Sequence, residues 1–362
     1  MKIMYCITRS NWGGAQAHVF ELIKDQVNKG NEVLLVVGEK GDLFNRVAEI
    51  NKVKLLYFPY LRRSLSPVVD FQAIFKLRRL IKKLSPDILH LHSSKAGAIG
   101  RIAAKGLSCK VIFTAHGWAF TEGVAPRKRL VYKYVERLLA RWTDKIICVS
   151  EYDYNLALKE SVLSINNHKG VVVYNGSKPS ARSLIDNKKE KKIRLVMTAR
   201  FDVPKRQDLL IKAIARLANP NYQVSLIGDG SNLENIQKMA EELQVSKQIK
   251  FLGFQTNVDK FLNNANIFVL LSDYEGLPIS IIEAMSHSLP IVASDVGGVP
   301  EEVKSGVNGY LVQNSIDSVV AGIKKASQNM LELGNNSLNI FQESFSLDKS
   351  LENINRIYYS LL

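Results

Sequence analysis

The order of apolar runs and amphipathic segments constrains this fold more than any other feature of the sequence. In the first half, short Val/Ile/Leu-rich runs alternate with helix-like segments, which include 16–29, 69–84 and 126–142. Continuous apolar runs separated by helices are typical of a parallel sheet covered by helices on both faces. The alternation restarts with IRLVMTA after a polar, lysine-rich stretch at 178–192. The sequence therefore predicts an α/β fold with two Rossmann-like domains.

The length of the chain fits this division, because 362 residues exceed the usual size of one domain. We expect an N-terminal domain over residues 1–178 and a C-terminal domain over residues 179–345. The last segment, 346–362, has a helical pattern and is expected to pack back on the N-terminal domain.

The composition gives no sign of a membrane-spanning or secreted chain. Hydrophobic residues make up 46% of the sequence, yet no window of ~18 or more apolar residues is free of charge. The first apolar segment, Ile3 to Ile7, is too short for the core of a signal peptide and is followed by Arg9. The sequence therefore predicts a cytoplasmic globular protein.

The three cysteines agree with that compartment. Cys6, Cys109 and Cys148 are odd in number and far apart, and they lack the CxxC spacing of zinc sites. We expect reduced cysteines in the core, no disulfide framework and no metal site.

The net charge of +15 is concentrated in the first half of the chain. Residues 1–178 hold 29 lysines and arginines against 14 acidic residues, whereas residues 179–362 hold 20 of each. Such asymmetry indicates that the first domain faces a polyanion or an anionic surface and that the second does not.

Candidate functional residues follow several of the apolar runs. They are the glycine pair 13–14, His116, Arg200, the segment 228–230 and Glu275. Ligands of open α/β sheets bind beyond the carboxyl ends of the strands, so these positions are expected to line a ligand site.

Gly13 and Gly14 precede a helical segment, so backbone N–H groups there are able to receive a phosphate. GGAQ lacks the spacing of the GxGxxG fingerprint, and a glycine pair in such a turn is often only a turn. Both interpretations stay open on this feature alone.

Arg200 and Lys205 flank a short loop that is able to present two cations to one diphosphate. A solvated pair of basic residues at a loop edge is the alternative. Arg206 adjoins Lys205, so the sequence leaves open which of the two contacts the phosphate.

His116 ends an apolar run in TAHGWAF, where its imidazole is placed to donate to a ligand hydroxyl or phosphate. His90 and His92 alternate in LHLHS and therefore share one face of a strand. No carboxylate or cysteine with ligand spacing accompanies them, so a structural role is favoured over a metal site.

Glu275 and Glu283 stand eight residues apart in SDYEGLPISIIEAM. Helical signals begin at Pro278, which places Glu275 in the preceding loop and Glu283 within the helix. Glu283 lies between apolar neighbours, so a buried or partnered carboxylate is more consistent than an exposed one. Such a group is able to accept hydrogen bonds from a vicinal diol such as a ribose.

These motifs together resemble those of a known family. EGLPISIIEA followed by PIVASDVGGVPE is similar to the E-x7-E segment of retaining glycosyltransferases of family 4 (GT4), which have the GT-B fold with a cleft between two Rossmann-like domains. GGAQ, TAHGW, VVYNGS and ARFDVPK stand in the order of that family's other motifs, so the likeness covers nearly the whole chain. HSSKAGAIGRIAAK further resembles the bacterial branch that builds capsule, exopolysaccharide and O-antigen units on lipid carriers.

The resemblance implies roles for the charged candidates. Glu275 would contact hydroxyls of the donor sugar, and Glu283 would contact the nucleotide ribose. Arg200 and Lys205 would hold the diphosphate and stabilise its charge as the sugar leaves. The family commonly has a Lys-Gly pair where this chain has Lys205 and Arg206, so the phosphate contact is not assigned to one of these two.

The resemblance also implies roles for backbone groups and for His116. Gly14, beside Gly13, would offer its N–H to the diphosphate, and His116 would hydrogen-bond the transferring sugar. Backbone N–H groups of Gly276, Leu277 and Ile279 would assist at a helix N-terminus. Fixed cations and helix dipoles supply charge stabilisation without a metal, so we expect no cofactor and no essential divalent ion.

The segment PRKRLVYKYVERLLARW combines a basic stripe with an apolar one. Arg129, Lys133, Arg137 and Arg141 recur at four-residue steps. A solvated helix face is the ordinary explanation. Because the whole charge excess lies in this half, we expect peripheral attachment to the anionic inner face of the cell membrane, where a lipid-linked saccharide acceptor is presented.

The expected function is therefore transfer of a hexose or N-acetylhexosamine from a nucleotide sugar, a UDP-sugar by expectation, to a polyprenyl-diphosphate-linked saccharide. Alternatives are a GT-B-fold epimerase or phosphorylase, and a non-catalytic basic protein that binds nucleic acid. A nucleic-acid-binding role would not explain the presence of Glu275 and Glu283 in their motif, so no nucleic-acid partner is expected.

Overall fold

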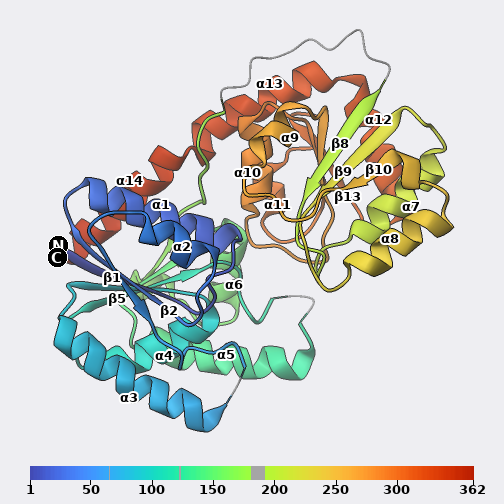
Figure 1. Ribbon diagram of the computed structural model, residues 1–362. Helices are drawn as coiled ribbons and strands as arrows, with labels where there is room; N and C mark the ends of the chain where they lie inside the picture. The colour runs from blue at the N-terminus through green and yellow to red at the C-terminus, as the bar shows by residue number, and fades with distance from the viewer. Residues whose placement is uncertain (65, 122–123, 181–191) are drawn as a thin grey trace. The chain divides into compact units, whose positions relative to one another are not determined.

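The computed structural model describes residues 1–64, 66–121, 124–180 and 192–362, which form two compact units (Figure 1). The first unit contains Met1–Tyr174 and Ser350–Leu362, and the second contains Asn175–Lys349. Each has a parallel sheet with helices, so the α/β prediction is confirmed. Most of the lysine-rich stretch at 178–192 lies outside the described residues.

Within its described residues, the first unit contains a seven-stranded parallel sheet in the order β3-β2-β1-β4-β5-β6-β7. β1 lies in the interior of the sheet, where β2 and β4 pair with it on either side. The strands are β1 (Lys2–Ile7), β2 (Glu32–Val37), β3 (Val53–Tyr57), β4 (Ile88–His92), β5 (Lys110–Ala115), β6 (Lys145–Cys148) and β7 (Gly170–Val172).

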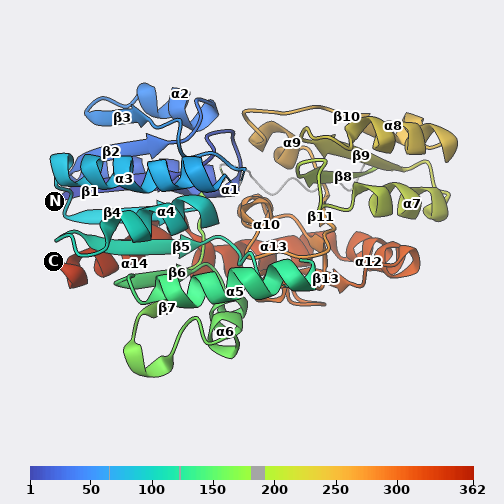
Figure 2. The same ribbon diagram turned by 90° about the horizontal axis from the view of Figure 1, so that it is seen from below.

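Helices cover both faces of this first sheet (Figures 1 and 2). The core on one face holds side chains of α3 (Pro67–Leu84), α4 (Ser94–Ala104), α5 (Pro126–Ala140) and α6 (Glu151–Lys159). The core on the other holds side chains of α1 (Gly14–Asn28), α2 (Asp42–Ala48) and α14 (Leu347–Leu361). Ile354 and Tyr358 of α14 are fully buried there, so the end of the chain packs on the first sheet.

The described part of the second unit contains a six-stranded parallel sheet in the order β10-β9-β8-β11-β12-β13. β8 and β11 are neighbours at its centre, and they carry the loops that hold Arg200 and Glu275. The strands are β8 (Ile193–Thr198), β9 (Tyr222–Ile227), β10 (Ile249–Phe251), β11 (Ile267–Leu270), β12 (Ile291–Ser294) and β13 (Gly309–Val312).

The helices of the second unit are amphipathic where they meet the sheet. In α7, for example, Leu210 and Ile214 are fully buried, whereas Arg216 points to solvent. The helices are α7 (Gln207–Leu217), α8 (Leu233–Glu242), α9 (Asp259–Asn263), α10 (Ile279–Ser286), α11 (Val299–Glu302), α12 (Ile316–Gln328) and α13 (Met330–Ile340). Short 3-10 turns span Ile165–Asn167 in the first unit and Ser246–Gln248 in the second, and a π turn spans Phe341–Phe345.

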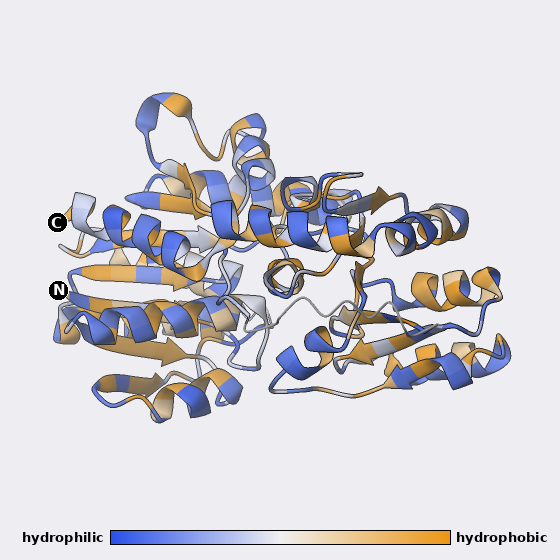
Figure 3. Cartoon of the chain, turned by 90° about the horizontal axis from the view of Figure 1, so that it is seen from above, coloured by the Kyte–Doolittle hydropathy of each residue, from blue (hydrophilic) through white to orange (hydrophobic). Residues whose placement is uncertain are grey.

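Figure 3 shows mainly hydrophobic strands in both sheets and helices that carry both hydrophilic and hydrophobic residues. This is the pattern that predicts the two sheets. The three cysteines are buried and free, as expected. In the part of the chain that the structure describes, no helix is both long enough and apolar enough to cross a membrane.

Candidate functional site

In the second unit, the loop after β11 carries Glu275 beside a lysine from the loop after β8. The ammonium of Lys205 forms an ion pair with the Glu275 carboxylate, which also accepts a hydrogen bond from the hydroxyl of Ser272. The side chains are only 17% and 11% exposed. The structure therefore joins two predicted site residues that are 70 positions apart in the sequence.

Backbone hydrogen bonds hold these two loops together. The N–H of Arg206 donates to the carbonyl of Leu271 at 2.9 Å, and the N–H of Asp273 donates to the carbonyl of Pro204 at 2.9 Å. Lys205 thus stands on backbone that is tied to the segment of Glu275. Such fixed geometry suits a group that must stabilise charge on a ligand without first rearranging.

Arg206 has a different set of partners from Lys205. Its Nε donates to Oδ1 of Asp208 at 2.9 Å, and one terminal nitrogen donates to Oδ2 of the same carboxylate at 3.0 Å. Its other terminal nitrogen donates to Asp273 at 3.0 Å. These hydrogen bonds, with Asp208 first, raise the pKa of the guanidinium further above its ordinary value. Arg206 therefore bridges the two loops through Asp208 and Asp273, whereas Lys205 is paired with Glu275, and contact of either with a ligand phosphate stays a prediction.

Arg200 is exposed in the loop after β8. Among the described residues its guanidinium has no hydrogen-bond or ion-pair partner, whereas its carbonyl accepts from the side-chain amide of Gln207 at 2.9 Å. The backbone is thus held while the cationic group stays available to an anion.

The start of α10 presents backbone N–H groups. Ile279 is its first residue, whereas Gly276 and Leu277 lie in the loop before it, and ligand binding by these three N–H groups stays a prediction. Pro278 is the residue before the helix rather than part of its first turn, and no described side chain caps the helix. The carbonyl of Leu277 accepts from the side-chain amide of Asn175 at 3.0 Å, which holds this segment in place. The first turn also lacks acidic residues, so an anion is the natural partner of these N–H groups.

Glu283 lies in α10 between the buried residues Ile282 and Ala284. Burial, together with the negative charge of Asp259, raises the pKa of its carboxyl to about 7. No described side chain donates a hydrogen bond to this carboxyl. The sequence predicts a buried or partnered carboxyl here, and in the structure Glu283 is half-buried between apolar neighbours. Its role toward a ligand diol stays a prediction.

Glu302, at the end of α11, is a carboxyl near this site that sequence reasoning missed. It is fully buried, and neither oxygen has a hydrogen-bond partner in the described structure. Burial, and then the nearby charges of Glu275 and Glu301, raise its pKa well above the ordinary value. The motif VPEE is typical of a polar surface segment, so no signal in the sequence points to this burial.

Gly297 sets the backbone position of Glu275, and its replacement gives a testable prediction. It has φ +56°, and a Cβ added there would lie 1.8 Å from the carbonyl oxygen of Glu275. We expect Gly297→Ala to push Glu275 out of place and to lower turnover about tenfold or more, because small displacements at a reacting centre are costly.

The matched control for this prediction is Gly306→Ala. Gly306 has φ +80°, but a Cβ added there would have no atom within 4 Å, so this variant carries the backbone strain without the collision. That strain costs about 1–2 kcal/mol of folding stability in both variants. Equal turnover in the two variants, measured alongside thermal unfolding, would show that Gly297 does not position Glu275.

In the first unit, the helix that follows β1 begins at Gly14, as the glycine pair predicts. Gly13 precedes it in extended backbone, and no described side chain caps the helix or places an acidic group in its first turn. The N–H groups of the first turn are therefore available to a ligand anion. Phosphate binding by Gly13 and Gly14 stays a prediction.

His116 follows β5 and belongs to a cluster of four histidine rings. His92 Nδ1 lies 3.1 Å from His116 Nε2, and the ring of His18 meets His116 edge-on with 5.2 Å between centroids. His90 is bonded at both nitrogens, to the Tyr358 hydroxyl at 2.6 Å and to the Thr114 hydroxyl at 2.7 Å.

Burial lowers the pKa of all four imidazoles. The value for His18 falls to about 4, and those of His90, His92 and His116 fall well below 6.5 because burial and the neighbouring histidines both oppose a positive charge. The cluster is thus neutral near pH 7. Across the described residues, no group of three or more His, Cys, Asp or Glu side chains is arranged to hold a metal ion.

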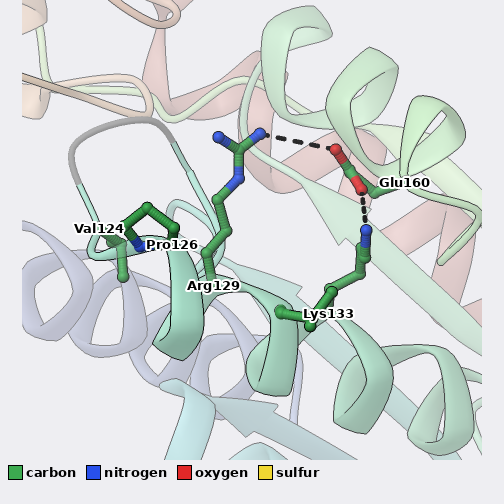
Figure 4. A pocket seen from close by; sticks show the side chains of 6 residues that line it. Val124, Pro126, Arg129, Lys133 and Glu160 are labelled. Carbon is green, nitrogen blue, oxygen red and sulfur yellow. Dashed lines mark ion pairs between the residues drawn. The ribbon is translucent and has the colours of Figure 1, made fainter.

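The basic stripe of α5 has an internal partner that the sequence did not indicate. The Glu160 carboxylate forms ion pairs with Lys133 at 2.9 Å and with Arg129 at 3.6 Å (Figure 4). The backbone carbonyl of Glu160 also accepts a hydrogen bond from Nε of Arg137 at 2.6 Å. Of the four stripe residues, Arg141 is the exposed one. Arg129, Lys133 and Glu160 line a pocket of about 200 Å³ together with Val124, Pro126 and Leu130.

Comparison with known families matches both halves of the chain. Residues 12–180 match the model described as Glycosyltransferase Family 4, and residues 183–338 match the model described as Glycosyl transferases group 1.

Among similar proteins is the Escherichia coli O-antigen biosynthesis glycosyltransferase WbnH, with 32% identity over 87% of this chain and 87% of that protein. Another is the E. coli UDP-Gal:alpha-D-GlcNAc-diphosphoundecaprenol alpha-1,3-galactosyltransferase, with 28% identity over 95% and 92%. The solved structure of Anabaena HepE in complex with UDP and glucose has a TM-score of 0.82 at 19% identity and covers 99% of this chain and 100% of that one.

Proposed function

The chain belongs to glycosyltransferase family 4 and is a glycosyltransferase of polysaccharide synthesis, and from this membership we propose its donor, acceptor and place of action. The donor is a UDP-sugar that carries a hexose or an N-acetylhexosamine. The acceptor is a polyprenyl-diphosphate-linked saccharide, and the sugar is transferred with retention of configuration. Support for this choice of substrates comes from the similar E. coli enzyme, whose name specifies UDP-galactose and a lipid-diphosphate acceptor.

The observation that carries the donor proposal is the Lys205–Glu275 pair beside the uncapped start of α10. A departing nucleoside diphosphate gains negative charge, which fixed cations and helix N–H groups stabilise. Lys205 and Arg200 would supply the cations, and Glu275, released from Lys205, would accept hydrogen bonds from sugar hydroxyls.

The remaining donor contacts are proposed for Glu283, for His116, whose Nε2 is already bonded to His92, and for Gly14. Glu283 would accept hydrogen bonds from the ribose diol, since its carboxyl has none within the described structure. His116 would bind the transferring sugar, and Gly14 would offer an N–H to the diphosphate. We propose that no divalent ion is needed, which predicts full activity in excess EDTA.

The acceptor proposal requires a membrane-facing surface, and one face of the first unit has the right charge. α3, α4 and α5 lie side by side on that face (Figure 2) and together hold 12 lysines and arginines against two acidic residues. Both acidic residues are already in ion pairs, Asp70 with Lys95 and Glu136 with Arg101. On the opposite face, α1, α2 and residues 350–361 of α14 hold three basic and four acidic residues.

The same face also exposes large apolar side chains. Leu130, Val131 and Tyr134 of α5 are 50%, 59% and 58% exposed, and Phe71 of α3 is 63% exposed. Apolar side chains on a face with a large excess of positive charge fit the interface of an anionic lipid bilayer. We therefore place the enzyme peripherally at the inner face of the cell membrane, with α5 contributing apolar residues rather than the basic stripe alone.

The reaction is tested by release of UDP from a panel of UDP-sugars, with a polyprenyl-diphosphate monosaccharide as acceptor. Acceptor-dependent release that falls about 100-fold or more in Glu275→Gln and Arg200→Ala is expected. Arg216→Ala is the control, because Arg216 is 69% exposed in the last turn of α7 and is not a candidate residue. Product NMR of the new anomeric centre decides retention, and inversion would refute that part of the proposal.

The membrane surface is tested by sedimentation with vesicles. Binding is expected to phosphatidylglycerol-containing vesicles and not to phosphatidylcholine alone, and paired Leu130→Ser and Tyr134→Ser changes should weaken it about tenfold. Leu331→Ser is the control, since Leu331 is 51% exposed on a helix of the charge-balanced half. Equal weakening by the control, or equal binding to both vesicle types, would contradict the assignment.

A further inference from the structure

His92 faces His116 through a single hydrogen bond whose direction follows from the surroundings. His92 is fully buried at the end of β4, and its Nδ1 lies 3.1 Å from Nε2 of His116. At this distance one nitrogen carries the proton and the other accepts it. Both imidazoles are neutral near pH 7, so each ring holds one N–H to place on either of its two nitrogens.

The other nitrogen of His92 decides between the two arrangements. His92 Nε2 is buried and has no hydrogen-bond partner in the described structure. If His116 donated to His92, the proton of His92 would lie on this enclosed nitrogen and leave an N–H group unsatisfied. In folded proteins, buried N–H groups without a partner are rarer than buried acceptors without one. The proton of His92 is therefore favoured on Nδ1, where it donates to His116.

The proton of His116 must then be on Nδ1. Among the described residues no hydrogen-bond partner faces this atom, and it is not one of the enclosed unpartnered atoms. His116 Nδ1 thus carries an N–H that protein groups leave unused and that a ligand oxygen is able to accept.

The packing of the cluster prevents His92 from turning to another partner. The ring of His90 lies 4.2 Å from that of His92 between centroids, and His18 lies 5.9 Å away. His90 is itself held by the hydroxyls of Tyr358 and Thr114. Side chains from β4, β5, α1 and α14 thus keep the ring of His92 in one orientation.

We propose that His92 is a positioning residue that holds His116 as the Nδ1–H tautomer, so that His116 acts as a hydrogen-bond donor to an oxygen of its ligand. The tautomer follows from this cluster alone, whereas the identity of the ligand as the transferring sugar rests on the proposed function. His92 itself touches no substrate in this assignment.

The direct test is the tautomer of His116 in uniformly ¹⁵N-labelled protein. Long-range ¹H–¹⁵N spectra near pH 7.5 distinguish a protonated from an unprotonated ring nitrogen. We expect His116 and His92 both to be protonated at Nδ1. A wild-type spectrum with the His116 proton on Nε2 would overturn the proposal, whatever the variants do.

Two variants of His92 separate positioning from packing. His92→Phe keeps a flat ring without a donor, so His116 should leave the Nδ1–H form and transfer should fall about tenfold or more. His92→Asn restores an N–H near the position of Nδ1 and should recover the tautomer and most of kcat. Loss of activity in both variants with the tautomer unchanged would contradict the assignment.

The outcomes for this proposal and for the proposed function are distinguishable. The expected tautomer in a protein that transfers no sugar would refute the glycosyl-transfer substrates and leave the role of His92 intact. Active transfer with the opposite tautomer would do the reverse.

Discussion

Lys205→Met should lower kcat for glycosyl transfer about 10²- to 10³-fold, the usual cost of removing one fixed group that stabilises transition-state charge. Lys205 is the cation that the structure places on Glu275, on backbone tied to the loop of that carboxylate. On the proposed function, its loss removes positive charge where the diphosphate would depart. It also leaves the Glu275 carboxylate, 11% exposed, without its ion pair while the hydrogen bond from the Ser272 hydroxyl remains.

The double variant Lys205→Met with Glu275→Gln separates these two effects. If Lys205 only neutralises Glu275, the uncharged amide introduced by Glu275→Gln should restore both folding stability and turnover. If Lys205 stabilises the leaving group, stability should recover while kcat stays low. Single-turnover kinetics and thermal unfolding of the same samples provide both readings.

Arg206→Met is the neighbouring control. Arg206 is committed to Asp208 and Asp273, so its loss should lower folding stability and change kcat less than about tenfold. A larger fall in kcat for Arg206→Met than for Lys205→Met would indicate that Arg206, and not Lys205, contacts the phosphate.

The second large effect is a loss of stability of the first unit as the pH falls below 6.5. The four clustered histidines have folded-state pKa values below the ordinary 6.5, with that of His18 at about 4. The unfolded chain therefore binds more protons than the folded one in this range, and stability falls with pH. Each histidine contributes about 1.4 kcal/mol per pH unit once the unfolded state is protonated.

The size of this effect follows from the number of groups. Four such histidines change the free energy of unfolding by up to about 5 kcal/mol per pH unit, against a typical total of 5–15 kcal/mol. The first unit should therefore unfold between about pH 6 and pH 4. The second unit should respond in the opposite direction. Because the pKa of Glu283 is raised to about 7, this carboxyl stabilises the fold below about pH 4.5, and that contribution is lost as the pH rises through 7.

Tryptophan fluorescence isolates the first unit, because Trp12, Trp118 and Trp142 all belong to it. Urea unfolding followed by this signal at several pH values gives the free energy of unfolding at each pH, and hence its slope against pH. His18→Leu should lower the slope of the free energy of unfolding against pH by the equivalent of about one proton. A free energy of unfolding that is constant between pH 7 and pH 5 would refute the neutral cluster.

The candidate site shows which inferences the sequence supports. Lys205 and Glu275 belong to loops that follow predicted strands, and because parallel strands end at one sheet edge, the two loops are expected to meet; the structure brings them together. The different partners of Lys205 and Arg206 were not predictable. The partners of Arg206 include Asp273, which folding brings to it from 67 positions away.

The basic stripe of α5 shows the opposite limit. Its four-residue spacing correctly indicated one helical face, yet spacing does not reveal what that face meets. In the structure Glu160 engages Arg129, Lys133 and Arg137, and the exposed face includes Leu130 and Tyr134. The proposed membrane-binding surface therefore depends on the summed charge of three helices and on the apolar residues among them. Both are properties of how the helices are arranged.

The two parallel sheets, the edge at which the charged residues gather and the family were predictable from the sequence, because hydrophobic periodicity and short motifs are local properties of the chain. Which charges are paired, buried or free could be read only from the folded chain. Glu302 and His92 illustrate the reason: the pKa and the hydrogen bonds of a polar group depend on everything that packs around it, and those neighbours come from distant parts of the chain.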